Sequence, residues 1–368
     1  MDPAELRRSI PALEERTYFN TGASGPSPRH VVEAATGFLE RHEFEGHGPR
    51  DPYEMGFGAI DDARVVAAEF LGAGTDDLAF TRSTADGISL VAGAIDFQPG
   101  DVVVRTDLEH PAGTLPWDRL ADTHGVEVRV VPTDRGRLDM AALKDAVEDA
   151  RLVVLSSLTW THGTRLPVAE VADVAHDAGA QVLVDAVQSV GHHPVDVTDW
   201  GADFVACAGH KWLLGVWGAG MLYVAPGAHD RLRQTRIGYR SVEDPGASEY
   251  TYHAGGRRFE VGTTTPAPYV ALAEAIETVE AVGFETIQSR VQRLTDRLKA
   301  GLGDRLVSPE DYESGLVTFA AEDPEATVQR LGEAGVVVRS LPQPRGAVRA
   351  SVHAFNTAED VDRLLDAL

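Results

Sequence analysis

One lysine of this chain stands in an unusual place. The sequence holds only three lysines, and two of them, Lys144 and Lys299, lie in amphipathic stretches where lysine is ordinary helix surface. Lys211 instead follows the apolar run "DFVACA", a glycine and a histidine, and it precedes a tryptophan. A partly buried lysine with positive neighbours has a lowered pKa, and its neutral amine can then attack a carbonyl carbon. The other interpretation is a surface lysine at the end of a strand.

Further polar residues occupy equivalent places. Asp185, His110 and the pair Ser83 and Thr84 each follow an apolar, strand-like run, as Lys211 does. Any one of them alone is readily explained as a helix cap. In open α/β sheets, however, ligands bind at the carboxyl ends of the strands. Four such positions together therefore predict one site at that edge of a sheet.

The elements that would position these residues appear as an alternating pattern. Between about residues 75 and 225, short β-rich runs alternate with amphipathic segments such as 167–179. Continuous apolar strands separated by helices are typical of a mostly parallel sheet covered on both faces. The strand candidates are "DLAFT", "DVVVRT", "VEVRVV", "RLVVLSS", "QVLVDA", "DFVACA" and "AGMLYV".

The remaining chain predicts a second, smaller domain. Residues 226–262 are polar and rich in Gly, Arg and Tyr, which is typical of a connecting or active-site loop region. Long helical patterns and then β-α-β-like pieces follow. We expect a large domain over residues 16–255 and a small C-terminal α/β domain over 256–368, with residues 1–15 packed on the small one.

Composition restricts the partners and the compartment. The chain has 368 residues and a formal charge of −24, so nucleic-acid backbones and anionic membranes would repel it. The single cysteine, Cys207, excludes an intrachain disulfide and fits a reducing compartment. The chain shows no charged-then-apolar leader and no run of about 18 apolar residues. These features predict a cytoplasmic protein that binds neither nucleic acid nor membrane.

The motifs, in their order along the chain, resemble the class V aminotransferase and cysteine desulfurase family of fold-type I enzymes, which depend on pyridoxal 5′-phosphate (PLP). The resemblance runs from "YFNTGASGPSP" near the start to "VRASVHAFNT" near the end. It implies a large α/β domain with a mostly parallel seven-stranded sheet and a smaller C-terminal α/β domain. It also implies a homodimer with composite active sites.

The resemblance assigns the strand-end residues to PLP. Lys211 would form the Schiff base. Asp185 would pair with the pyridine nitrogen, which keeps the ring protonated and able to accept electrons. Gln188 would hydrogen-bond the ring hydroxyl, Val187 would pack on one face of the ring, and His110 would stack on the other.

The phosphate is expected at the segment "RSTADG". Ser83, Thr84 and the following backbone amides, that of Ala85 first, would bind the anion together with His210. Many relatives carry a hydroxyl residue at the positions of Ala85 and Ala208, so two hydroxyl contacts are absent here and weaker PLP binding is expected.

The remaining contacts implied by the resemblance involve the partner subunit and the substrate. Thr263, in "FEVGTTT", would reach the phosphate from the second subunit. Arg349 would bind the carboxylate of a small amino-acid substrate, because a bidentate guanidinium orients the bonds at Cα relative to the ring. A surface arginine beside a strand is the other interpretation. Arg339, Arg50 and Trp160 are further candidates for the same pocket.

The persulfide mechanism of cysteine desulfurases is not expected. Those enzymes carry a nucleophilic cysteine on a loop before the final "RAS" motif, and here that region, "VVVRSLPQPRGAVRAS", contains none. Cys207 lies in an apolar strand, where free cysteine is usually inert. Trp160 stands where desulfurases have an asparagine. Both features resemble instead the branch of cystine C–S lyases, isopenicillin-N-epimerase-like proteins and class V aminotransferases.

The expected activity is therefore at the α-carbon of a small amino acid. Transamination and C–S β-elimination of a cysteine-like substrate remain close alternatives, and epimerisation is a third. A PLP-binding sulfur-trafficking or regulatory protein without turnover is the alternative that involves no catalysis. The histidines show no metal-ligand spacing, so no metal site is expected.

Overall fold

The computed structural model describes residues 1–47 and 51–368. Its centre is a seven-stranded sheet of order β2-β10-β9-β8-β7-β3-β4. The strands from β9 to β4 pair in parallel, whereas β10 runs antiparallel to both of its neighbours. The expected mostly parallel α/β fold is thereby confirmed. The strands are β2 (Leu78–Thr81), β3 (Val102–Thr106), β4 (Glu127–Val131), β7 (Ala150–Ser156), β8 (Gln181–Asp185), β9 (Phe204–Ala208) and β10 (Gly220–Val224).

Side chains of this central sheet alternate between two cores, because successive residues of a strand point to opposite faces. In β8, Leu183 belongs to the core under α4 and α5, whereas Val182 and Val184 belong to the core under α3, α7 and α8. Helices therefore cover both faces of the sheet, as its continuous apolar strands require. The covering helices are α3 (Pro52–Leu71), α4 (Thr84–Ala94), α5 (Leu115–His124), α7 (Val168–Asp177) and α8 (Ala267–Val282).

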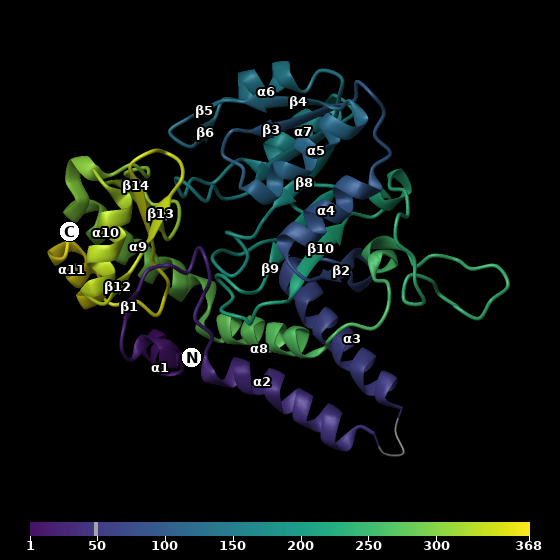
Figure 1. The fold of residues 1–368 in the computed structure, drawn as a ribbon, viewed down its shortest axis with the longest axis horizontal. Coiled ribbons are helices and arrows are strands. Elements are labelled where there is room, and N and C mark those ends of the chain that lie inside the picture. The colour runs from purple at the N-terminus through teal and green to yellow at the C-terminus, as the bar shows by residue number, and fades with distance from the viewer. Residues whose placement is uncertain (48–50) are drawn as a thin grey trace.

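The C-terminal part of the chain forms a second sheet, which lies on the left in Figure 1. Its strand order is β11-β14-β13, and both pairs are antiparallel. We call this part, residues 284–368, the small unit. Its elements are α9 (Phe284–Leu302), β11 (Leu316–Ala320), α10 (Pro324–Glu333), β12 (Val336–Val337), β13 (Arg339–Leu341), β14 (Ala347–Ser351) and α11 (Ala358–Asp366).

The N-terminal segment packs on the small unit. Strand β1 (Thr17–Tyr18) pairs in parallel with β12, and the two lie together in Figure 1. Arg7 of α1 (Pro3–Arg8) forms an ion pair of 2.8 Å with Asp360 of α11. Helix α8, in contrast, packs on α2 (Arg29–Glu40) and α3. The predicted domain boundary between residues 255 and 256 would place α8 in the small domain, and it stays a prediction.

Smaller elements complete the described chain. The hairpin of β5 (Thr133–Asp134) and β6 (Arg137–Leu138) precedes α6 (Met140–Ala146). Within residues 1–47 and 51–368, no helix combines the length and the apolar character that crossing a membrane would need.

Candidate active site

The carboxyl ends of the parallel strands border one cavity of about 230 Å³. Asp185 ends β8, the segment after β9 supplies Lys211, and the loop after β3 supplies His110. The small unit faces this edge and contributes two arginines from β13 and β14. The cavity is lined by Gly22, Ala23, Ser83, Thr84, Ala85, His110, Ala112, Trp160, Asp185, Val187, Gln188, His210, Lys211, Arg339 and Arg349.

The structure brings together the residues expected at cofactor and substrate, with two exceptions. Thr263 does not line this cavity, and its exposed side chain forms a hydrogen bond with the hydroxyl of Tyr239 in the same chain. Arg50 lies outside the described residues. The roles of all these residues stay predictions, but their common location is a property of the fold.

Lys211 is the lysine that can react at this cavity. Its pKa is lowered to about 8, mainly by burial, which Asp185 opposes and to which the two arginines of the cavity add. A substantial fraction of the amine is therefore neutral near physiological pH. Lys299 instead donates to the carbonyl oxygen of Asp311 at 2.7 Å beside a larger cavity of about 940 Å³. Lys144 is exposed on α6.

The Asp185 carboxylate is buried at the floor of the cavity. Its Oδ1 accepts a hydrogen bond of 3.0 Å from the backbone N–H of Val187. Burial raises the pKa of Asp185, whereas this N–H and the charge of Lys211 favour the anion. In the part of the chain that the structure describes, no hydrogen bond reaches Oδ2, so this oxygen is available to a ligand.

His110 presents a neutral ring in a fixed tautomer. Its Nδ1 accepts a hydrogen bond of 3.2 Å from the backbone N–H of Ala112. Burial and, to a smaller extent, the charge of Lys211 lower its pKa to about 4. A neutral imidazole that accepts at Nδ1 carries its proton on Nε2. The ring meets that of Trp160 edge to face, with centroids 5.1 Å apart.

Helix α4 begins at the cavity, which its first residues line. Ser83 is its N-cap and accepts a hydrogen bond of 3.1 Å from the backbone N–H of Asp86. The Oγ1 of Thr84 is buried and has no hydrogen-bond partner among the described residues. Backbone N–H groups at a helix start favour an anion, and Ala85 can add only its backbone. Burial lowers the pKa of His210 to about 4, so its ring would contact an anion as a neutral donor.

Arg349 is a buried cation that forms no ion pair within residues 1–47 and 51–368. The residue is 0% exposed, and only its Nη1 is bonded, at 2.7 Å, to the carbonyl oxygen of Trp160. Its Nε and Nη2 have no partner within the described chain. Arg339 lies directly opposite Arg349 in the β13–β14 register, which places a second positive charge nearby. Because a buried unpaired charge is costly, this end of the cavity is built for an anion.

The sequence model of the family described as "Aminotransferase class-V" matches residues 17–364. The chain belongs to the class V aminotransferase family. Members of this family are PLP-dependent enzymes, so the expected family, cofactor and enzymatic nature are confirmed.

Named relatives and solved structures support this assignment over the whole chain. A probable cysteine desulfurase of Methanothermobacter thermautotrophicus is 34% identical over 100% of this chain and 98% of its own length. The apo structure of a cysteine desulfurase from Thermococcus onnurineus NA1 superposes with a TM-score of 0.92 at 30% identity, covering 100% of this chain and 97% of the other. The cystine C–S lyase C-DES, in complex with its reaction product cysteine persulfide, superposes with a TM-score of 0.90 at 29% identity, covering 97% and 98%.

The residues present in this member of the class V aminotransferase family fit PLP. The unpartnered hydroxyl of Thr84 and the start of α4 suit its phosphate, and the free oxygen of Asp185 suits its ring nitrogen. Lys211 lies at the same cavity with a lowered pKa, as attack on an aldehyde requires.

Glu109 is a buried carboxylate that the motifs did not reveal. Its Oε1 accepts from Thr106 Oγ1 at 2.6 Å and from the backbone N–H of Ser156 at 3.1 Å, and its Oε2 accepts from Ser156 Oγ at 2.7 Å. Burial raises the pKa of Glu109 to about 7 in spite of these bonds. It ties the ends of β3 and β7 together beside His110. In the sequence, an acidic residue before "HPAG" looks like a solvated loop charge.

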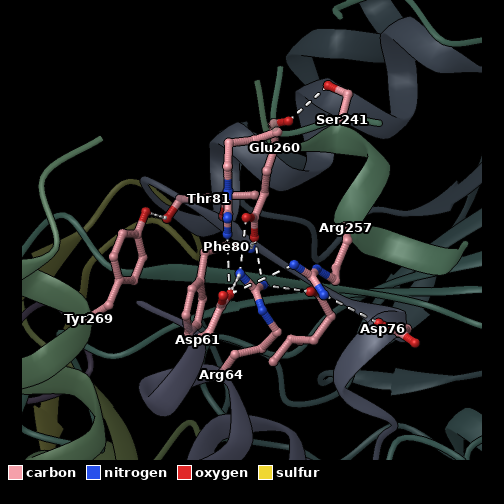
Figure 2. Close-up of polar contacts among 11 residues, drawn as sticks. Asp61, Arg64, Asp76, Phe80, Thr81, Ser241, Arg257, Glu260 and Tyr269 are labelled. Atoms are coloured by element: carbon pink, nitrogen blue, oxygen red, sulfur yellow. Dashed lines mark hydrogen bonds and ion pairs between the residues drawn. The ribbon is translucent and has the colours of Figure 1, made fainter. Parts of the chain in front are cut away.

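An ion-pair network holds the segment before Thr263 against β2. No sequence motif indicated this network. In Figure 2, both terminal nitrogens of Arg64, a residue of α3, donate hydrogen bonds to the carboxylate of Glu260. The two distances are 2.6 and 3.0 Å. Glu260 also accepts from the backbone N–H of Phe80 in β2 at 2.9 Å. Because β2 leads directly to Ser83, the network fixes this segment against the strand that ends at the expected phosphate site.

Proposed function

We propose that this enzyme acts at the α-carbon of a small, cysteine-like amino acid, by C–S β-elimination or by transamination, and without a persulfide on the protein. One observation carries the proposal: a lysine with a pKa of about 8 and the buried, unpaired guanidinium of Arg349 border the same small cavity. The first can react with an aldehyde and move a proton, and the second can hold the carboxylate of an amino acid.

The chain's residues would divide the work as follows. When bound, PLP supplies an electron sink for the electron pair left at Cα. The free oxygen of Asp185 would accept a hydrogen bond from the protonated ring nitrogen and so keep the proton there. Lys211 Nζ would take the proton from Cα and return it, because its pKa lies close to the working pH.

The substrate end of the cavity favours a small side chain. Arg349 would bind both carboxylate oxygens through Nε and Nη2, the two nitrogens without partners. The buried indole Nε1 of Trp160 also lacks a partner among the described residues and could donate to the substrate. The crossed rings of His110 and Trp160 restrict the space beside these donors.

The environment of Cys207 supports the absence of a protein persulfide. This residue is the only cysteine of the chain, and it is 0% exposed on β9. Burial raises its pKa, and the charge of Asp185 raises it further. The thiolate is the nucleophilic form, and it would not be present at neutral pH. Sulfur would therefore leave on a small molecule, just as cysteine persulfide is the reaction product named for the cystine C–S lyase C-DES.

The test is a product assay with L-cystine, L-cysteine and L-alanine. Pyruvate formed from cystine without an amino acceptor would indicate β-elimination, whereas pyruvate from alanine that requires an acceptor would indicate transamination. The D-isomer alone would indicate epimerisation. PLP binding without any product would favour the sulfur-trafficking or regulatory alternative. Loss of turnover in Cys207→Ala with fold and PLP content intact would contradict the persulfide-free mechanism.

We also infer a homodimer with shared active sites. Thr263 is exposed and does not line its own chain's cavity, so its expected phosphate contact would be made in the partner subunit. Two large aromatic side chains are exposed beside it, Tyr53 at 56% and Tyr239 at 45%. Exposed apolar patches of this kind mark interaction surfaces. The charge of −24 supports the absence of nucleic-acid partners, and the single cysteine supports the expected cytoplasmic location.

A further inference from the structure

The carboxamide of Gln188 is held from two sides. Its Nε2 donates a hydrogen bond of 2.9 Å to the carbonyl oxygen of Gly22. Its Oε1 accepts a hydrogen bond of 2.8 Å from the indole Nε1 of Trp212. Gln188 lines the cavity, whereas Trp212 lies behind it and is fully buried.

These two partners leave the carboxamide of Gln188 one orientation. An indole N–H can only donate, and a backbone carbonyl can only accept. Reversing the amide would set its NH₂ against the indole N–H of Trp212 and its oxygen against the oxygen of Gly22, and both contacts would be repulsive. An NH₂ group has two hydrogens, and Gly22 takes one of them. The second Nε2–H of Gln188 therefore remains free to donate a hydrogen bond.

The indole of Trp212 is itself held firmly. The ring of His192 meets it edge on, with centroids 4.3 Å apart, and the ring of His353 stacks on it at 5.9 Å. His353 Nε2 also donates to the backbone carbonyl of Trp212 at 3.1 Å. His353 belongs to the small unit and His192 to the loop after β8. The donor that reaches Gln188 is thus positioned by both parts of the molecule.

We propose that Trp212 is a positioning residue, whose indole N–H holds the Gln188 carboxamide so that its second Nε2–H faces the ring hydroxyl of PLP. This inference rests on the proposed function, since Gln188 meets that hydroxyl only if the cavity holds PLP. A donor there stabilises the hydroxyl oxygen as an anion, whereas an acceptor would stabilise its protonated form. Trp212 would in this way set the protonation state of the cofactor without touching it.

The test compares the absorption spectra of the PLP-loaded wild type and Trp212→Phe. The variant should shift absorbance from the longer-wavelength form, with the hydroxyl ionised, to the shorter-wavelength form, with the hydroxyl protonated. The dissociation constant for PLP should rise about three- to tenfold, as expected for the loss of one hydrogen bond near a charge. Trp117→Phe is the matched control, because Trp117 is also fully buried and its indole N–H has no partner among the described residues.

A double-mutant cycle separates positioning from general packing. If Trp212 acts through Gln188, Trp212→Phe should add no spectral change in a Gln188→Ala background. Equal changes in both backgrounds, or an unaltered spectrum in Trp212→Phe, would overturn the inference. If Trp212→Phe does not fold, site-specific replacement of Trp212 by benzothienylalanine, which keeps the ring shape and lacks the N–H, gives the same comparison. A wild-type protein that binds no PLP would instead refute the proposed function.

Discussion

Lys211 and Arg349 are positive groups at one cavity that have no carboxylate within ion-pair distance among the described residues. Arg349 in particular keeps two nitrogens unbonded in the interior. Folding alone would favour neutral or paired residues at such a position, because an unpaired buried charge destabilises the folded state. The cost is explained if ligands complete the interactions, with an aldehyde at the lysine and a carboxylate at the arginine. Both residues can be tested separately.

For Lys211, the rate at which the apoprotein captures PLP should rise with pH. The amine reacts only when neutral, and burial sets its pKa at about 8. Below this pKa the neutral fraction grows about tenfold per pH unit, and above it the rate should level off. Stopped-flow absorbance of apoprotein mixed with PLP measures the rate, and Lys211→Ala should show no covalent capture. A borohydride-reducible adduct in that variant, on Lys144 or Lys299, would refute the assignment.

For Arg349, substitution should weaken the substrate and spare the cofactor. Arg349→Ala removes a charged, bidentate donor, so substrate affinity should fall at least about tenfold while the spectrum of bound PLP stays unchanged. Arg349→Lys should rescue only in part, because an ammonium lacks the planar fork. Arg345→Ala, an exposed arginine of the β13–β14 turn, serves as the control. Loss of PLP from Arg349→Ala would place this arginine at the phosphate instead.

At the scale of elements, a histidine pair joins the loop after β8 to the small unit. The backbone N–H of Gly315, just before β11, donates to His192 Nε2 at 2.7 Å. His192 must then carry its proton on Nδ1 and donate it to His193 Nδ1, at 2.7 Å. Arg165 Nη2 is also 2.9 Å from His193 Nδ1. This chain of donors and acceptors is satisfied only while both rings are neutral.

The pair should therefore make the fold sensitive to acid. Burial and, to a smaller extent, the charge of Arg165 lower the pKa of His193 to about 3, and burial holds the pKa of His192 well below its usual value. Below pH ~6.5 the unfolded chain binds protons that the folded chain cannot, so the free energy of unfolding falls as pH falls, by ~1.4 kcal/mol per pH unit for each histidine. His193→Asn keeps an acceptor in place of Nδ1 and does not titrate.

Denaturant unfolding between pH ~4 and ~6 checks this expectation. The dependence of the unfolding free energy on pH should be shallower in His193→Asn by up to ~1.4 kcal/mol per pH unit. His124→Asn, at an exposed position of α5, provides the comparison. An unchanged slope in His193→Asn would show that His193 is protonated in the folded protein.

The seven strands of the central sheet were predictable because most of their residues are apolar, although β4 carries Glu127 and Arg129, and the strand ends located Lys211, Asp185 and His110. Those signals are local in the sequence. The supporting contacts are not: Gly315 lies far along the chain from His192, and "GHH" by itself suggests a simple turn. Trp212 likewise meets Gln188 only after the strands have assembled, so no local pattern marks it.

At the scale of the molecule, the cavity lies where separate parts of the chain meet. The central sheet supplies Lys211 and Asp185, the small unit supplies Arg349, and the segment after β1 supplies Gly22. In Figure 1 the small unit lies on the left and the central sheet to its right, with α2 and α8 below them. Among the described residues, Thr263 is the one expected site residue that lies outside the cavity. A second subunit would account for its position.

Subunit mixing tests whether active sites are shared. Thr263→Asp would put a negative charge against the phosphate and should abolish PLP binding at the site that this residue serves. In a dimer of Lys211→Ala with Thr263→Asp, the chain that keeps Lys211 receives an intact Thr263 from its partner. Random pairing makes half of the dimers mixed, each with one good site, so about a quarter of the wild-type sites should reappear. Each variant mixed only with itself should recover no wild-type site. If the mixture also recovers nothing, although mass spectrometry shows mixed dimers, Thr263 serves the site of its own chain. If Thr263→Asp alone keeps its PLP sites, Thr263 serves no site.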